Sequence, residues 1–315
     1  MNLIVPVLAA LAGACVYGVT GILQQRNAHE VEGDPTDQAG LIKGLIRRPA
    51  WVLSTIGSIV GFGLQGLALG TGPIVMVQPL LVTGIIFGAV TGFIVRRQRV
   101  DWAFMGTLLL TVGGLAVFLV VARPSGGNAS LTVGEALPLG IALLVLLAAS
   151  VALGLRTKGL SRSLSFALAA GLVYGATAAV AKVTIAQFPD GFVATVTHWS
   201  FWALVVLGPL GFLLNQNAFR EGELASPALA VITVVDPLVG IAIGLLWLDE
   251  RIAGSPGAIV GEILGLAAMA GGVWLVAHRA PRVAEENPEK ADENPEKPDG
   301  DDGDEVSRSA AAGSH

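Results

Sequence analysis

The sequence predicts an all-α polytopic membrane protein of about nine transmembrane helices, and three observations lead to this fold class. Apolar residues make up 53% of the 315 residues and charged residues only 14%, against about 25% in a soluble domain. Apolar runs of about 20 residues, each long enough to cross a hydrocarbon core of about 30 Å, recur between short polar joints. Lys and Arg are concentrated in every second joint. The lipid bilayer is therefore the expected surrounding of most of the chain.

The individual spans are expected at residues 3–24, 51–70, 73–95, 102–122, 137–155, 164–186, 193–214, 225–248 and 257–277. The first begins at once, has no basic residue before it, and is too long for the apolar region of a cleaved signal peptide. We therefore expect a retained first helix and a mature chain that starts at Met1.

The basic residues predict the orientation in the membrane, because cytoplasmic joints carry an excess of Lys and Arg. The face opposite the N-terminus collects thirteen of them: Arg26, Lys43, Arg47, Arg48, Arg96, Arg97, Arg99, Arg156, Lys158, Arg162, Arg220, Arg279 and Arg282. The other face holds Arg123 and Arg251, and Lys182 lies inside the sixth span. We expect a multi-pass protein of the plasma membrane with its N-terminus outside and its C-terminus in the cytoplasm.

The segment from about Pro281 differs in composition from everything before it. It is rich in Pro, Glu, Asp and Lys, and it repeats ENPEK at 286–290 and 293–297. Residues 285–308 contain eleven acids and three basic residues, a net charge of −8. Because the formal net charge of the whole chain is −5, the rest of the chain carries +3. Such a segment buries too little apolar surface to fold, so a disordered acidic cytoplasmic tail is expected.

Three pairs of short motifs recur at one spacing, which predicts a duplication. VYG at 16–18 returns at 173–175, Gln78-Pro79 corresponds to Asp236-Pro237, and Gly113-Gly114 corresponds to Gly271-Gly272, each 157 or 158 residues later. The second half starts after five membrane crossings. Because five is an odd number, the two halves are expected to lie in the membrane in opposite orientations. Inverted repeats are typical of secondary transporters, whose site lies near the midplane between the repeats. The chain then divides into a first repeat at 1–160, a second repeat at 161–280 and the tail at 281–315.

An aspartate directly before a proline interrupts the apolar run ITVVDPLVGIAIG at 232–244. A carboxylate at the bilayer centre costs about 2.5–3.5 kcal/mol even on lenient scales, and proline removes a backbone donor. A role in substrate binding or coupling is therefore expected for this acid. The candidate residues are Asp236, Gln78, Gln65, Asn215, Gln216, Tyr17 and Tyr174, with Pro79 and Pro237 as helix breaks.

Other polar residues in the spans leave two interpretations open. Each candidate amide either contacts substrate or forms a hydrogen bond between helices. Lys182 and Glu262 lie near the outer ends of their helices, and we expect both to extend toward the membrane surface. His198 lies near the outer end of the seventh span beside two tryptophans, which is ordinary for the interface, although a gating or proton-relay role stays open.

An enzyme is not expected, and neither is a cofactor. Catalysis inside a membrane needs a nucleophile with a base or a set of metal ligands, and the chain has one cysteine, Cys15, and neither H-E-x-x-H nor G-x-S-x-G. GFGLQG at 61–66 matches the dinucleotide pattern G-x-G-x-x-G, but it lies within a predicted membrane helix with no strand before it, so we interpret it as a packing feature. No metal site and no nucleic-acid partner are expected.

Several motifs together resemble the drug/metabolite transporter superfamily. They are TGPIVMVQPL at 71–80, LLNQNAFREGELASPALAVITVVDPL at 213–238, LDER at 248–251 and the Gly-Gly helices four and nine. The likeness runs from about residue 3 to 278, is EamA-like, and is closest to the nine-helix NIPA-like branch, through QQRNAHE at 24–30 and the P-x5-P-L segment at 73–80. The resemblance implies a secondary carrier that works by alternating access.

For the NIPA-like branch the resemblance also implies magnesium as the transported ion. This chain departs from that pattern, because Phe62 stands where the family has an acidic residue. Mg²⁺ is bound through carboxylates and retained waters, and Asp236 and Glu262 are distant acids. A small organic solute or metabolite is therefore the first expectation and a magnesium or other divalent cation transporter the second. A non-transporting receptor or scaffold is a further alternative, and a homodimer is left open.

Overall fold

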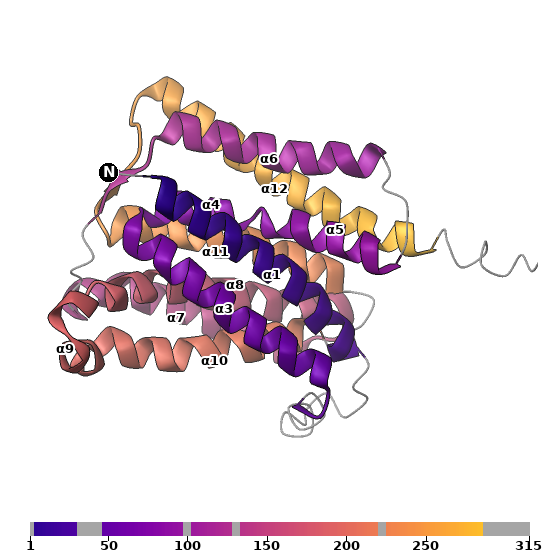
Figure 1. Ribbon diagram of the computed structural model, residues 1–315, viewed down its shortest axis with the longest axis horizontal. Coiled ribbons are helices and arrows are strands. Elements are labelled where there is room, and N and C mark those ends of the chain that lie inside the picture. The colour runs from indigo at the N-terminus through magenta and orange to yellow at the C-terminus, as the bar shows by residue number, and fades with distance from the viewer. Residues whose placement is uncertain (1–2, 30–45, 97–101, 128–132, 220–224, 286–315) are drawn as a thin grey trace, which may run out of the picture.

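The computed structural model describes residues 3–29, 46–96, 102–127, 133–219 and 225–285. Those residues contain nine helical segments long and apolar enough to cross a membrane, and they lie side by side in one bundle (Figure 1). The predicted fold class, all-helical with nine spans, is confirmed. Most of the acidic tail, Lys43, Arg97, Arg99 and Arg220 lie outside the described residues.

The helices are α1 (Ile4–His29), α3 (Pro49–Thr71), α4 (Ile74–Leu81), α5 (Gly84–Arg96), α6 (Trp102–Ala122), α7 (Val133–Arg156), α8 (Gly159–Ile185), η1 (Phe188–Asp190), α9 (Phe192–Thr197), α10 (Trp199–Phe219), α11 (Ala225–Leu246) and α12 (Pro256–Glu285). Two short strands, β1 (Ser125–Gly126) and β2 (Glu250–Arg251), pair antiparallel. They join the connection after α6 to the connection after α11.

Three span boundaries differ from the sequence prediction. The third span is two helices, α4 and α5, because Pro79 lacks an N–H and the chain passes through tight turns in which Val82 N donates to Pro79 O and Thr83 N to Leu80 O. The seventh span begins later than predicted, since His198 is extended and separates α9 from α10. Helix α12 continues through Pro281 to Glu285, so the tail does not begin at Pro281.

The two ends of the bundle receive alternate connections. Helix α1 begins at one end, called here the N-terminal end, and α12 finishes at the opposite end, called here the C-terminal end (Figure 1). The β1–β2 pair and α9 lie at the N-terminal end (Figure 1). Which end faces the cytoplasm stays a prediction from the distribution of Lys and Arg.

Corresponding helices of the two halves pack in the same way. Helix α1 packs on α3 and α5, and α8 packs on α10 and α11, while α6 and α12 form a further pair. Small residues permit this closeness: a Cβ on Gly18 would lie 2.7 Å from Gly88 N, and one on Gly114 would lie 2.7 Å from Gly265 O. The inverted repeat itself stays a prediction. The similar packing of corresponding helices in the two halves supports it.

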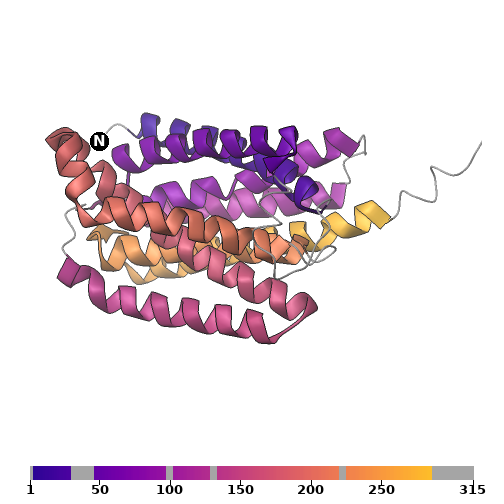
Figure 2. The same ribbon diagram turned by 90° about the horizontal axis from the view of Figure 1, so that it is seen from below.

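Large apolar side chains cover the outside of the bundle. Leu144 on α7, Val120 on α6 and Ile263 on α12 are all exposed, and α7 lies at the edge of the bundle, packed on α8 (Figure 2). Apolar surface of this extent is expected where a protein faces lipid rather than water. The structure thus supports a membrane-embedded chain.

Candidate functional site

The carboxyl of Asp236 lies deep in the bundle, midway along α11. Helix α11 approaches α8 closely here, because a Cβ on Gly175 would lie 2.7 Å from Asp236 O and one on Gly171 would lie 2.7 Å from Val235 Cβ. One carboxylate oxygen, Oδ1, is inaccessible and has no hydrogen-bond partner among the described residues. The residue as a whole is only half-buried. Asp236 therefore combines a deep position with incomplete packing and an unsatisfied acceptor, which is rare in a protein interior.

Two tyrosines from different halves lie near this carboxyl. Tyr17 comes from α1 and Tyr174 from α8, and Asp236 is within range of direct electrostatic interaction with both phenols. The Tyr17 hydroxyl donates to Gln65 Oε1 at 2.9 Å, and Tyr174 shares a hydrogen bond with Asn215. Four of the candidate residues are thus grouped around the carboxyl of a fifth, Asp236.

The two tyrosine environments match each other residue by residue. The ring of Tyr17 lies against Gly61, where an added Cβ would be 3.0 Å from Tyr17 Cε1, and the ring of Tyr174 lies against Gly211, where it would be 2.8 Å from Tyr174 Cε1. In each case the amide partner lies four residues after that glycine, one helical turn away. Gln65 and Asn215 therefore form hydrogen bonds between helices and orient the tyrosines.

The amide of Gln78 is fully enclosed and lies against α11. It is 1% exposed, and a Cβ on Gly240 would lie 2.6 Å from Gln78 Cγ. Neither amide atom has a hydrogen-bond partner among the described residues. Gly240 is four residues from Asp236, about 6 Å along the helix axis. Gln78 therefore lies within about one turn of the carboxyl and adds an unpaired donor and acceptor.

Helix α4 runs antiparallel to α11 at this contact, since Ile74 lies at Gly244 and Gln78 at Gly240. One turn further along α4, the break at residues 82–83 falls at the level of Asp236. Helix α11, by contrast, continues through Pro237 without interruption. Of the two predicted helix breaks, only the one after Pro79 occurs in the described structure.

Gln216 is not joined to this group by any described contact. It is 2% exposed, and both its amide atoms lack partners among the described residues. It directly follows Asn215 on α10, so its backbone is one residue from the partner of Tyr174, and Ala218, two residues later, accepts a hydrogen bond from Ser163 in the first turns of α8.

The prediction that Lys182 extends to the membrane surface is wrong. Its Nζ lies 2.5 Å from Glu250 Oε1 and donates to Gly72 O at 3.0 Å. Glu250 also accepts hydrogen bonds from Ile74 N at 2.7 Å and Val75 N at 2.9 Å, the first backbone donors of α4. Lys182 and Glu250 are both buried, and the carboxylate lies where the dipole of α4 favours negative charge.

Sequence reasoning missed Glu250 because it falls two residues past the predicted end of the eighth span, in a connection. A signal was present in LDER at 248–251. A lysine inside a membrane span requires a nearby partner, and an acid at the edge of another span would satisfy that requirement.

Glu262 also departs from the sequence prediction. It is 5% exposed, and its Oε1 has no hydrogen-bond partner among the described residues, so its carboxyl does not extend to the surface. His198 Nδ1 lies 2.8 Å from Ser200 Oγ, which receives a hydrogen bond from Thr184. This arrangement fixes the start of α10, and no described contact links it to Asp236.

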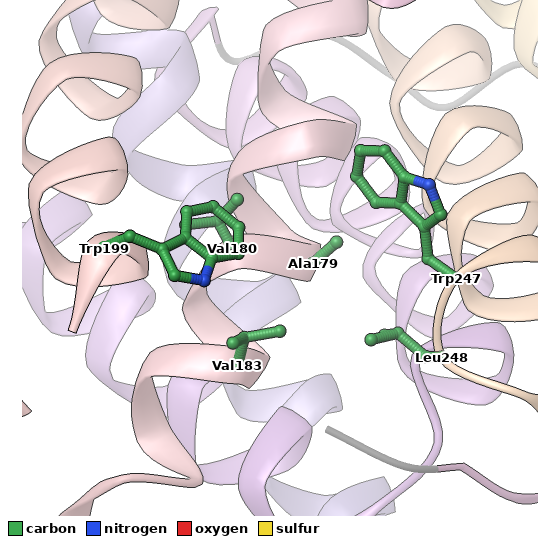
Figure 3. A pocket seen from close by; sticks show the side chains of 6 residues that line it. All are labelled: Ala179, Val180, Val183, Trp199, Trp247 and Leu248. Carbon is green, nitrogen blue, oxygen red and sulfur yellow. The ribbon is translucent and has the colours of Figure 1, made fainter. Parts of the chain in front are cut away.

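A small apolar gap lies near the N-terminal end of the bundle. Trp199 and Trp247 stand on either side of it, with Ala179 between them, and Val180, Val183 and Leu248 complete its walls (Figure 3). It has no room for a water molecule and includes none of the candidate residues. Within the described ranges, no group of three or more His, Cys, Asp or Glu side chains is placed to hold a metal ion.

Comparison with known proteins shows a distant relative of this chain. The chain is 26% identical over 251 residues to an uncharacterized protein of Corynebacterium glutamicum, and the match covers 78% of this chain and 85% of that protein. No family model matches the chain. No solved structure matches it either.

Proposed function

We propose that the protein is a secondary carrier of the drug/metabolite transporter type, which moves a small organic solute across the membrane by alternating access. The observation that carries the proposal is Asp236, a carboxyl deep in the bundle with an unpaired oxygen and with a tyrosine from each half within electrostatic range. Such a charge is retained in a membrane interior where it serves transport or binding. A site between two halves is also the arrangement of carriers built from repeats.

The matched environments of Tyr17 and Tyr174 support a duplication with opposite orientation. The glycine under each ring and the amide four residues later occur in both halves. Alternating access follows readily from such a pair, because two similar halves can exchange their conformations around one central site.

The chemistry of the site favours a solute with one positive charge, or a proton coupled to the movement of a neutral solute. One carboxyl balances one charge, and the Gln78 amide offers a free donor and a free acceptor nearby. Magnesium is less suited, because it needs several oxygen ligands in octahedral geometry. A scaffold that binds no ligand would gain nothing from an unpaired carboxyl at this depth, and uptake separates a carrier from a receptor.

Uptake into proteoliposomes tests the proposal. A thermal-shift screen of purified protein against metabolites, organic amines and divalent cations would first supply the solute. Asp236→Asn should then lower uptake by about tenfold or more, because about 1.4 kcal/mol of lost interaction is a factor of ten, or should remove its pH dependence. Asp249→Asn makes the same chemical change at an exposed position and should leave uptake unchanged. Equal uptake by both variants at every pH would contradict the assigned role of Asp236.

A further inference from the structure

Lys182 and Glu250 connect the two halves of the protein at the N-terminal end. Both belong to the second half, whereas the groups that they bind besides each other belong to the first half. These groups are Gly72 O, bound by Lys182, and the backbone N–H groups of Ile74 and Val75, bound by Glu250. Three hydrogen bonds with a charged partner thus cross between the halves at one point.

Further contacts between the halves lie at the same end. Ala253 N donates to Ala122 O at 2.8 Å, and Ser125 and Gly126 of β1 pair with Arg251 and Glu250 of β2. A Cβ on Gly127 would lie 2.9 Å from Glu250 Cγ, so the first half also covers the side of this acid. The N-terminal end is therefore closed by polar and backbone contacts.

The contact between the halves toward the C-terminal end is of another kind. Trp51 of α3 meets Phe212 of α10 edge to face, with ring centroids 6.1 Å apart. The indole Nε1 of Trp51 is buried without a hydrogen-bond partner among the described residues. An aromatic contact with an unsatisfied donor holds two halves less firmly than a fully bonded ion pair does.

We infer that Lys182 and Glu250 form the latch that closes the N-terminal end of the carrier, and that the structure shows the protein with this latch closed. The inference rests on the proposed carrier function. Because both charged residues belong to the second half, separation of the halves leaves the ion pair intact. The three bonds from Lys182 and Glu250 to the first half are exchanged for bonds to water, as are the backbone bonds of the neighbouring β1–β2 connection.

This arrangement avoids the main obstacle to opening a buried ion pair. Removing one partner of such a pair leaves an uncompensated charge, whereas here each charge keeps its partner in both conformations. A carrier needs contacts at each end that form and break in turn. The contact of Lys182 and Glu250 with the first half is strong while it is buried, and water can replace its bonds when the end opens.

The accessibility of Val75 tests the latch directly. Its side chain is fully buried behind the ion pair, where a Cβ on Gly244 of α11 would lie 2.9 Å from Val75 Cγ2. In a Cys15→Ala background, Val75→Cys should react slowly with a membrane-impermeant thiol reagent applied at the N-terminal end. Adding Glu250→Gln should raise the labelling rate by about tenfold or more, which corresponds to about 1.4 kcal/mol lost from the closed state.

Two further variants separate the latch from a general folding defect. The double variant Lys182→Met with Glu250→Gln contains no unpaired charge and should label as fast as Glu250→Gln alone. Asp249→Asn disturbs only the exposed pair of Asp249 with Arg251, at 3.9 Å, and should label at the parent rate. A parent-like rate in both latch variants would overturn the latch.

A disulfide gives an independent test that leaves the latch residues unchanged. Ser125 and Arg251 are direct partners in the β1–β2 pair, and Cα atoms of antiparallel partners are close enough for a disulfide. Oxidised Ser125→Cys/Arg251→Cys protein should stop transporting, and reduction should restore transport. Full transport after oxidation would refute opening at this end. Absence of transport by the reduced protein would instead refute the carrier function, and the labelling result would stand by itself.

Discussion

The two Gly-Gly pairs make a quantitative prediction about the packing of α6 against α12. A Cβ on Gly114 would lie 2.7 Å from Gly265 O and 2.9 Å from Ala268 C, whereas Gly113 has no atom within 4 Å of the same position. On α12 the pattern repeats: a Cβ on Gly272 would lie 2.7 Å from Thr111 N, and Gly271 is open. One glycine of each pair therefore faces the partner helix and the other faces away.

The expected effect of alanine differs within each pair. At Gly114 and Gly272 an added Cβ would collide with backbone atoms of the partner helix, so α6 and α12 must move apart by about 1 Å. Overpacking of this kind costs about 1–3 kcal/mol. Alanine also gains up to about 1 kcal/mol of helix propensity over glycine. Gly114→Ala and Gly272→Ala should thus destabilise by about 1–2 kcal/mol. Gly113→Ala and Gly271→Ala should be neutral or stabilising by up to about 1 kcal/mol.

Reversible unfolding by SDS, followed by circular dichroism, measures these four differences. Each open glycine is the matched control for its neighbour, since the substitution, the helix and the depth in the membrane are the same. Four equal effects would show that α6 and α12 do not pack through this face. A difference in one pair alone would contradict the equivalence of the two helices.

Two further predictions concern the orientation and the tail. In a Cys15→Ala background, Gly254→Cys should react with an impermeant thiol reagent in intact cells and Lys158→Cys should not, because the N-terminal end is predicted to face outward. The reverse labelling pattern would show the opposite topology. Truncation after Glu285 should leave insertion and transport intact, since the residues beyond it are too polar to join the membrane core, and a loss of expression or uptake would contradict this.

The sequence predicted the spans well because hydrocarbon imposes a length and a composition that can be counted along the chain. The predicted range 102–122 has the same bounds as α6. Hydropathy could not separate α9 from α10, because the residues on both sides of His198 are mostly apolar and the break is a change of backbone conformation at His198. The same holds for α4 and α5, where Pro79 was recognised but the chain turns three residues later.

Part of the candidate site was visible in the sequence because motifs that recur at one spacing mark positions with similar surroundings. VYG in each half pointed to Tyr17 and Tyr174, and the structure adds a hydrogen-bonded amide to each. The Lys182–Glu250 pair could not be found this way, because its members are 68 residues apart and have no counterpart in a local pattern. Only the folded chain shows which acid reaches the lysine.

Helix α4 links the latch to the candidate site, because it takes part in both. Its first backbone donors bind Glu250, and four residues after the first of them the Gln78 amide lies against α11 about one turn from Asp236. The helix has eight residues and ends in a break, so it can move as a short rigid piece. If the halves separate at the N-terminal end, α4 loses its contact with Glu250 and Gln78 shifts relative to Asp236. Under the proposed carrier function, solute binding at Asp236 and opening at Glu250 would thus be coupled through one helix, as alternating access requires.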